Sequence, residues 1–449
     1  MYLKQIEIRN IKCFSELKLS FTSRKEKSGI RPWTVLLGEN GTGKSALLRA
    51  IGAVLAGPDA MRQLLPFPET WVRAGGKCDG EIRADLLRSE EDYLMQDMAG
   101  SGSCFVRCTV SDPKTSPYPG IRFESHTGDG DISENMSGVS PYAEQGQGWL
   151  ACGYGPFRRL SGGDEISKRI LDSGRRSARF VTLFYESAAL INVEEWLKEL
   201  YNTAHDGDER NRQCLEFVKQ AFQKKLLPLP SELLVDARQA KLKVEGQKPI
   251  RFDELSDGYR SMLALGVDLI RRLTAAFPDA ANYTACPGIV LIDELDAHLH
   301  PKWQREIGFW LLEKFPGLQF IVATHSPFLA QVTSEQGGNI LLRRMPDEIS
   351  ACSDMAAVET WRADQILREL FELESSRSPV VIKGIREFQN LNLRHWQGTL
   401  SEKEREKYQR LRRWVEELPV IQDSEERLLA ENYHQAVVRH AAELKDLLQ

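Results

Sequence analysis

The chain has 449 residues, and its 59 basic and 64 acidic side chains give a formal net charge of −5 at pH 7. This length is enough for two or three domains with hydrophobic cores, so it excludes a small disulfide-stapled scaffold. Hydrophobic residues make up 42% and charged residues 27% of the chain, as in ordinary soluble proteins, which excludes a disordered tail protein. The near-neutral balance means that any nucleic-acid contact would need a local basic patch.

No stretch of about 18 apolar residues occurs, so we expect no segment that spans a membrane. The alternating N-terminal residues lack the apolar core of a signal peptide. The eight cysteines are scattered, and although Cys104 and Cys108 are close, no second pair completes a zinc site. Together these features predict a protein of the reducing cytoplasm.

The first half of the chain begins as strand, loop and helix. Residues 2–9 and 17–21 alternate polar and apolar side chains, which predicts a β-hairpin. Residues 33–37 form a short apolar run typical of a buried parallel strand, and residues 45–57 follow with helical spacing. Residues 100–148 are rich in Gly, Ser, Pro and Asp and predict strands and loops, before a strand near 149–155 returns to the core.

The second half alternates helices and strands. Helical patterns occur over 186–227, and residues 231–252 predict two strands joined at Glu245–Gly246. Between 255 and 345 helices alternate with apolar strands such as GIVLID (288–293) and LQFIVAT (318–324), which is the pattern of an α/β fold. The tail from about residue 359 is helical and polar.

A glycine-rich loop follows the strand at 33–37. Residues 38–45 (GENGTGKS) match the pattern G-x-x-x-x-G-K-[ST], in which glycines let the backbone curl its N–H groups around phosphate oxygens. The helix that starts at Ser45 adds its positive end, Lys44 reaches the β- and γ-phosphates, and the Ser45 hydroxyl ligates Mg²⁺. The pattern therefore predicts ATP and Mg²⁺ as cofactors, with nucleotide contacts from Gly38, Asn40, Gly41, Thr42, Gly43, Lys44, Ser45 and Ala46.

Two acidic residues stand at the end of a second apolar strand. Asp293 and Glu294 follow GIVLI, at the edge where ligands of open α/β sheets bind. We expect Asp293 to hold Mg²⁺, directly or through water, and Glu294 to orient or deprotonate the attacking water. His325 follows the next strand, and although a lone histidine is usually structural, this position favours a hydrogen bond to the γ-phosphate.

A further helix start lies upstream of the acidic strand. Ser256 and Gly258, in LSDGYRS, open a helix and form another anion site. With Asp296 in LDAH, the order of motifs resembles the ABC-class ATPases of the SMC, RecF and OLD kind. The resemblance is strongest to AAA-type ATPases of bacterial anti-phage defence systems, such as the Septu and PARIS subunits. It rests on GENGTGKS, YGPFRRL (154–160), LSDGYRS, LIDELDAHLHPKWQ (291–304), ATHSPFL (323–329) and ADQILRELF (363–371).

The resemblance implies a fold, an activity and partners. The fold class is α/β, an ABC-type P-loop ATPase head with a mixed sheet flanked by helices, an inserted helical and β lobe, and a C-terminal helical extension. Ser256, Gly258 and Asp296 would contact ATP across a homodimer or higher oligomer, while Lys44, Glu294 and His325 serve hydrolysis. The chain would be a sensor or scaffold whose dimer state holds or releases an effector, a nuclease. We expect no nuclease domain within this chain.

The resemblance also implies a division into four parts. Residues 1–75 hold the N-terminal part of the head, 76–230 the inserted lobe, 231–350 the C-terminal part of the head, and 351–449 the helical extension. Asp257 and Tyr259 depart from the transporter-type LSGGQ, which argues against a transporter subunit. The Q-loop has no assigned position, since Gln145 and Gln147 lie in a glycine-rich stretch.

Other readings stay open. A RecF- or RecN-like DNA repair ATPase is the alternative function, and a nucleotide-binding module that barely hydrolyses ATP is a third. Seven basic residues between 158 and 179 form either a DNA contact or a solvated or internally paired basic face. They are Arg158, Arg159, Lys168, Arg169, Arg175, Arg176 and Arg179. His298 and His300 alternate like a ligand pair, but they also match the HLHP turn of the family.

Overall fold

The structure is a computed structural model. It describes residues 1–26, 28–75, 79–89, 103–111, 120–127, 148–158, 164–173, 176–190, 192–223, 231–244, 248–280, 282–333, 337–346, 348–353, 355, 358–373, 375 and 377–418. Contacts divide the chain into two compact units, Met1–Glu372 and Leu373–Gln449. Within the described residues, no helix is long and apolar enough to cross a membrane.

A mixed sheet forms the centre of the first unit. Among the described residues its strand order is β14-β13-β3-β12-β11-β7. The strands are β3 (Trp33–Leu37), β7 (Leu150–Tyr154), β11 (Gly288–Ile292), β12 (Leu318–Ala323), β13 (Asn339–Arg344) and β14 (Ile349–Cys352). Neighbours from β7 to β13 are parallel, and β14 is antiparallel to β13. Parallel strands bring their carboxyl ends to one edge, so the segments after β3, β7, β11 and β12 meet there.

An antiparallel sheet covers one side of the first unit. Its strand order among the described residues is β2-β1-β4-β5-β6. The strands are β1 (Tyr2–Ile11), β2 (Phe14–Ser20), β4 (Gly80–Leu87), β5 (Ser103–Ser111) and β6 (Gly120–Thr127). The predicted N-terminal hairpin is confirmed, with Ile8 opposite Leu17. Strands β4 to β6, from the region predicted as an inserted lobe, extend this hairpin sheet, and the four-part division of the chain stays a prediction.

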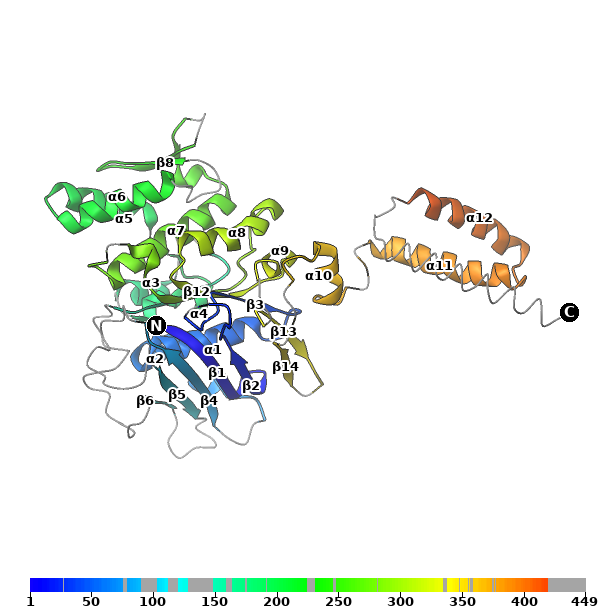
Figure 1. Ribbon diagram of the computed structural model, residues 1–449, viewed down its shortest axis with the longest axis horizontal. Coiled ribbons are helices and arrows are strands. Elements are labelled where there is room, and N and C mark those ends of the chain that lie inside the picture. Colours follow the sequence, from blue (N-terminus) through cyan, green and yellow to red (C-terminus); the bar gives the residue numbers. More distant parts are fainter. Residues whose placement is uncertain are drawn as a thin grey trace. The chain divides into compact units, whose positions relative to one another are not determined.

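Helix α1 (Lys44–Ala56) lies between the two sheets (Figure 1). Its Leu47 and Ile51 share one buried cluster with Ile8 of the antiparallel sheet and Ile321 of the mixed sheet. A helix that is apolar on nearly all sides needs such cover on both faces. This cover on both faces fixes the position of α1 relative to the two sheets.

Helices α7 (Asp257–Ala276) and α8 (Pro301–Lys314) cover the other face of the mixed sheet (Figure 1). Successive side chains of a strand point to opposite faces, so Val35 faces these helices while Leu36 faces α1. The remaining helices of the described part are α2 (Pro58–Leu64), α3 (Glu165–Asp172), α4 (Val181–Phe184), α5 (Val193–His205), α6 (Glu209–Gln223), α9 (Pro327–Ala330) and α10 (Ala363–Glu369). Short 3-10 turns occur at Pro68–Trp71, Arg176–Arg179, Phe252–Glu254 and Tyr283–Ala285. The predicted alternation of helices and strands over 255–345 is confirmed.

A small sheet packs with α5 and α6. Its order is β10-β9-β8, made of β8 (Ser231–Val235), β9 (Ala240–Val244) and β10 (Ile250–Arg251). The sequence predicted two strands over 231–252, but the described residues form three, because Val235 pairs with Ala240 and a further turn lies at 236–239. Asp236 makes this turn by accepting hydrogen bonds from the backbone N–H groups of Arg238 and Gln239. Residues 245–247 lie outside the described residues.

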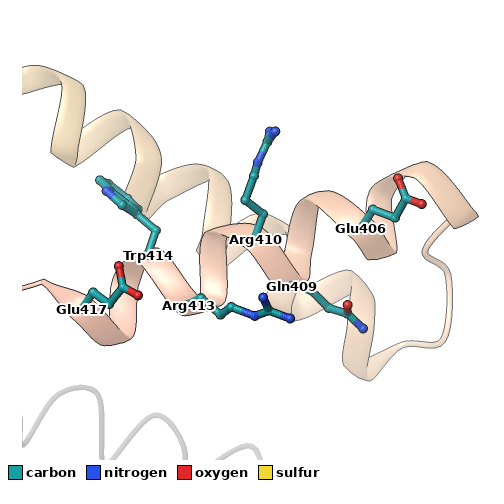
Figure 2. Close-up of a pocket in the computed structure, with 6 residues that line it drawn as sticks. All are labelled: Glu406, Gln409, Arg410, Arg413, Trp414 and Glu417. Atoms are coloured by element: carbon teal, nitrogen blue, oxygen red, sulfur yellow. The ribbon is translucent and has the colours of Figure 1, made fainter.

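The second unit is a helical hairpin of α11 (Pro379–Trp396) and α12 (Glu402–Glu417). A capping box begins α12, since Ser401 donates from its backbone N–H to Glu404 at 3.0 Å and from its hydroxyl at 2.7 Å. Trp414 of α12 lies over Gly384 of α11, where a Cβ would come within 2.6 Å of the indole ring. Figure 2 shows Trp414 beside a hollow whose labelled residues all come from α12.

A buried carboxylate ties α7 to β7 in the first unit. Asp268, which is fully buried, accepts hydrogen bonds from Tyr154 Oη at 2.8 Å, Arg272 Nε at 2.5 Å and Arg271 Nη2 at 3.0 Å. Burial by itself would raise the pKa of Asp268, but the two arginines outweigh it and lower the pKa to about 2. The ion pair therefore stabilises the fold at neutral pH, and this contribution is lost as the pH falls toward about 2.

We expect Asp268→Asn to destabilise the first unit by about 3–5 kcal/mol, because the two arginine charges would stay buried without their carboxylate. Urea unfolding of the full chain, followed by circular dichroism, measures this. The matched control is Asp279→Asn, which removes an exposed ion pair with Arg210 at 2.9 Å and should cost about 0–1 kcal/mol. Equal unfolding midpoints for the two variants would contradict the stabilising role.

Candidate nucleotide-binding site

The glycine-rich loop after β3 adopts the phosphate-binding conformation that its sequence predicts. Gly43 stands at the N-cap of α1 with φ +89°, in the left-handed region that favours glycine. A Cβ there would come within 2.6 Å of Cys13 Sγ and 2.8 Å of the Phe14 ring. The loop is therefore packed against the β1–β2 turn, and only glycine fits at this position.

Lys44 occupies the centre of the loop. It is only 7% exposed, and its ammonium donates to the carbonyls of Gly38 at 2.7 Å and Glu39 at 2.9 Å. Burial lowers the pKa of Lys44, while Asp293, Glu294 and Asp296 favour the charged form. Because these acids act on Lys44 from the end of β11, the loop and the acidic strand form one electrostatic site.

Ser45 and Asp293 meet at the end of β11. The Ser45 hydroxyl lies close enough to the Asp293 carboxylate to favour its charged form, and Asp293 is 3% exposed. Burial raises the pKa of Asp293, and the Ser45 hydroxyl and the charges of Arg49, Lys44 and Arg158 oppose this. The Oδ1 atom of Asp293 is buried without a hydrogen-bond partner. A hydroxyl beside an unpartnered carboxylate oxygen is a donor set that fits Mg²⁺.

Glu294 follows directly and is exposed. Its backbone has φ +45°, a left-handed conformation that is costly for a residue with a Cβ. The next N–H, of Leu295, donates to the Ala323 carbonyl of β12 at 3.2 Å. The charge of Glu294 influences both Lys44 and His325, so the carboxylate lies on the side of the phosphate loop.

The loop after β12 is held by Asp296. The Asp296 carboxylate accepts hydrogen bonds from the Thr324 hydroxyl and from the backbone N–H of His325 at 3.3 Å. Burial, followed by the charge of Lys44, lowers the pKa of His325, so its ring is neutral at pH 7. Within one chain, Asp296 therefore fixes the segment that carries His325, a role that its place in the sequence did not reveal.

The helix start at Ser256 is exposed and close to the turn after β11. Ser256 is the N-cap of α7, and Ser256 and Asp257 are both exposed. Gly258 lies against this turn, because a Cβ there would come within 2.9 Å of the His298 carbonyl. The N-termini of α1 and α7 thus both belong to the first unit, and Ser256 is exposed.

The side chain of Arg158 reaches this turn from β7. It is 4% exposed and donates to the carbonyls of Asp293 at 3.3 Å, Glu294 at 3.1 Å and Leu295 at 3.4 Å. Its Nε donates to Ser261 Oγ of α7 at 3.2 Å. The motif YGPFRRL contains Arg158, but no local pattern in it predicts these contacts.

Three of the described basic residues in the stretch 158–179 make contacts inside the protein. Arg158 and Arg176 are buried, and Arg179 donates to the Trp149 carbonyl at 3.2 Å. Arg176 also lies over the Trp149 ring at 4.6 Å. A DNA contact through these three arginines is wrong, because their guanidinium groups are used inside the protein. The exposed members among the described residues are Lys168 and Arg169, while Arg159 and Arg175, like Gln145 and Gln147, lie outside them.

The histidine pair after the acidic strand is not a metal cluster. His300 is the N-cap of α8, where its Nδ1 accepts from the Lys302 N–H at 3.3 Å, and His298 is exposed. In the part of the chain that the structure describes, no group of three or more His, Cys, Asp or Glu side chains is placed to hold a metal.

A hollow opens beside the first turns of α1. Its walls include Ala46 and Arg49 of α1 and the aromatic side chains of Trp71, Phe184 and Tyr185. One of its lining residues, Ala46, directly follows Ser45 of the phosphate loop in the sequence. Aromatic and apolar walls of this kind suit a planar base.

Comparisons with known proteins agree with this geometry. A family described as an AAA domain, putative AbiEii toxin, Type IV TA system, matches residues 116–330, and an AAA ATPase domain matches residues 1–67. Septu protein PtuA of Bacillus mycoides is 29% identical over 329 residues, which are 73% of this chain and 38% of that protein. The Retron Ec83 probable ATPase of Escherichia coli is 34% identical over 203 residues, 43% of this chain and 35% of that protein.

The relatives are longer than the region they share with this chain. The chain spans little more than a third of the length of these two proteins. Among solved structures, an SMC head bound to the C-winged helix domain of ScpA overlaps with a TM-score of 0.49 at 16% identity, over 80% of this chain and 100% of that one. The SMC head domain from Thermotoga maritima overlaps with a TM-score of 0.45 at 13% identity, over 79% and 100%.

We expect Asp293→Asn to separate stability from activity. The substitution removes a buried charge, and because burial raises the pKa of Asp293, the ligand-free protein should become more stable at pH 7. The gain should shrink as the pH falls and the wild-type Asp293 takes up its proton. Thermal unfolding over a series of pH values from 7 downward, with Mg²⁺-dependent ATP hydrolysis measured alongside, checks both halves. A variant that is less stable at pH 7, or that hydrolyses ATP normally, contradicts this view.

Proposed function

We propose that this chain, an AAA-type ATPase related to Septu protein PtuA and to the retron ATPases, binds Mg²⁺–ATP and hydrolyses it to ADP and phosphate. The observation that carries the proposal is the meeting of Ser45 with the buried, partly unpartnered carboxylate of Asp293. Glu294 stands one residue further on, where a base for the attacking water is needed.

The phosphate loop binds the triphosphate in this proposal. The carbonyls that now accept from Lys44 give way to the β- and γ-phosphate oxygens, and the N-terminus of α1 adds its partial positive charge. The hollow lined by Trp71 and Phe184 receives the base. When bound, Mg²⁺ neutralises charge on the transferred phosphoryl group, and Ser45 and Asp293 are the residues that would hold it.

Hydrolysis depends on the two segments that face the phosphates. Glu294 accepts a proton from the attacking water, and the neutral ring of His325 donates a hydrogen bond to the γ-phosphate. Asp296 supports this step indirectly, because it fixes the backbone N–H of His325.

A second copy completes the site in this proposal. The exposed Ser256 and the N-terminus of α7 form an anion site that does not serve the phosphate loop of its own chain. A homodimer would place each such helix start over the ATP of its partner, so ATP would close the dimer and hydrolysis would open it.

The biological setting follows from the relatives. We place the chain in anti-phage defence as a sensor or scaffold whose nucleotide-dependent dimer state holds or releases an effector, a nuclease supplied by another chain. The likeness to Septu protein PtuA supports this setting, as do the free thiols, which suit a reducing cytoplasm. A DNA-repair role has less support, because Arg158, Arg176 and Arg179 of the basic stretch considered for DNA make contacts inside the protein.

We expect Glu294→Gln to bind ATP with unchanged affinity and to hydrolyse it about 10²–10⁴-fold more slowly, because the amide cannot take the proton of the water. ATP binding by calorimetry and phosphate release report the two properties separately. Glu313→Gln, an exposed change on α8, is the matched control and should turn over ATP like the wild type. Normal turnover by Glu294→Gln would overturn the assignment of the base.

The trans arrangement predicts complementation. Lys44→Ala and Ser256→Arg should each abolish hydrolysis alone, whereas an equimolar mixture should regain about a quarter of wild-type activity, since half of the dimers are mixed and each contains one intact site. Steady-state ATPase assays of the separate and mixed proteins measure this. Failure of the mixture to regain activity, with mixed dimers shown by mass photometry of tagged chains, would refute a shared site.

A further inference from the structure

The turn that carries Glu294 has an unusual backbone that needs support. Glu294 has φ +45°, and such conformations persist only where the surroundings hold them. The backbone N–H groups at its two ends are used, because Asp293 donates to Tyr154 of β7 and Leu295 donates to Ala323 of β12. The Glu294 carbonyl accepts from the backbone N–H of Ala297 at 3.0 Å, and one side chain from outside the sheet reaches the carbonyls of all three residues 293–295.

That side chain is Arg158. Its guanidinium donates to three successive carbonyls of the turn, at 3.1 to 3.4 Å, and to the hydroxyl of Ser261 on α7. Arg158 itself has φ +35°, so two strained residues face each other across these bonds. Among the described residues, none of its hydrogen bonds goes to a carboxylate, so its contacts serve the backbone geometry of the turn rather than an ion pair.

We propose that Arg158 is a positioning residue for hydrolysis, which holds the turn 293–295 so that Glu294 faces the γ-phosphate and which couples this turn to α7 through Ser261. This inference rests on the proposed ATPase function and adds a residue and a physical link to it. The acceptors of Arg158 are three backbone carbonyls and the Ser261 hydroxyl. Arg158 acts through Glu294, and any displacement of α7 by a second copy would reach Glu294 through the same guanidinium.

Only arginine has the required shape. Its planar fork presents several N–H donors in fixed directions, which match the spread of four acceptors around it. A lysine would keep the positive charge that Asp293, Glu294 and Asp296 favour, but its single ammonium cannot hold three consecutive carbonyls and a hydroxyl at once. Charge and geometry are therefore separable by one substitution.

The test is Arg158→Lys in the full chain. We expect kcat for ATP hydrolysis to fall by about 10²-fold, since a displacement of a catalytic group by about 1 Å has this effect. KM and the calorimetric affinity for Mg²⁺–ATP should stay unchanged, because Lys44, Ser45 and Asp293 remain in place. The loss should disappear in the Glu294→Gln background, where the carboxylate that Arg158 positions is absent. Added guanidinium should restore part of the kcat of Arg158→Ala.

The matched control is Arg272→Lys. Arg272 is as buried as Arg158, with 5% exposure, but it binds Asp268 on the far part of α7. We expect Arg272→Lys to lower the thermal unfolding midpoint and to leave kcat unchanged. A second arm uses Ser261→Ala, whose effect on kcat should be absent in the Arg158→Lys background if the two side chains act as one link.

The outcomes are distinguishable. If the wild type hydrolyses ATP in a Glu294-dependent manner and Arg158→Lys keeps its kcat, this inference is overturned while the proposed function stands. A structural role would give a different result. If Arg158→Lys and Arg272→Lys both lower the affinity for Mg²⁺–ATP, the thermal unfolding midpoint and kcat to the same extent, the inference is also overturned. If the wild type shows no hydrolysis, the proposed function itself fails.

Discussion

The turn at 293–296 is the structural element on which the site depends. Each of its residues makes a contact that a different part of the chain needs: Asp293 with Ser45, Leu295 with Ala323, and Asp296 with the segment of His325. Its left-handed residue, Glu294, is the one whose side chain is left exposed toward the phosphate loop. Backbone strain and chemical availability thus coincide at one position.

The layers around the turn explain why it can keep this geometry. Helix α1 is enclosed between an antiparallel and a mixed sheet, and its N-terminus is fixed against the β1–β2 turn at Gly43. On the other face, α7 is tied to β7 by the buried Asp268. The carboxyl ends of parallel strands bring the segments after β3, β7, β11 and β12 to one edge. Small displacements at this edge would move the metal ligands and the base together.

The sequence allowed the core of the site to be predicted because its signals are local. Lys44 and Ser45 follow a strand within one motif, and Asp293 and Glu294 follow an apolar run, so strand order alone brings them together. The role of Arg158 could not be predicted, because its partners lie about 135 residues away and their carbonyls leave no trace in the sequence. The hydrogen bond between Asp296 and Thr324 could not be predicted either, because these residues are also distant in the sequence. Arg176 and Arg179 show that a basic cluster in the sequence need not form a basic surface, because both side chains make contacts inside the protein.

The central claim is that Ser45 and Asp293 prepare a site for ATP together with a divalent cation. Calorimetric titration of the full chain with ATP, once with Mg²⁺ and once with EDTA, tests it most directly. The account predicts one ATP bound per chain and a much weaker affinity when Mg²⁺ is removed, because the carboxylate of Asp293 would then face the phosphates without compensation. Equal affinity under the two conditions, or no binding in either, would contradict it.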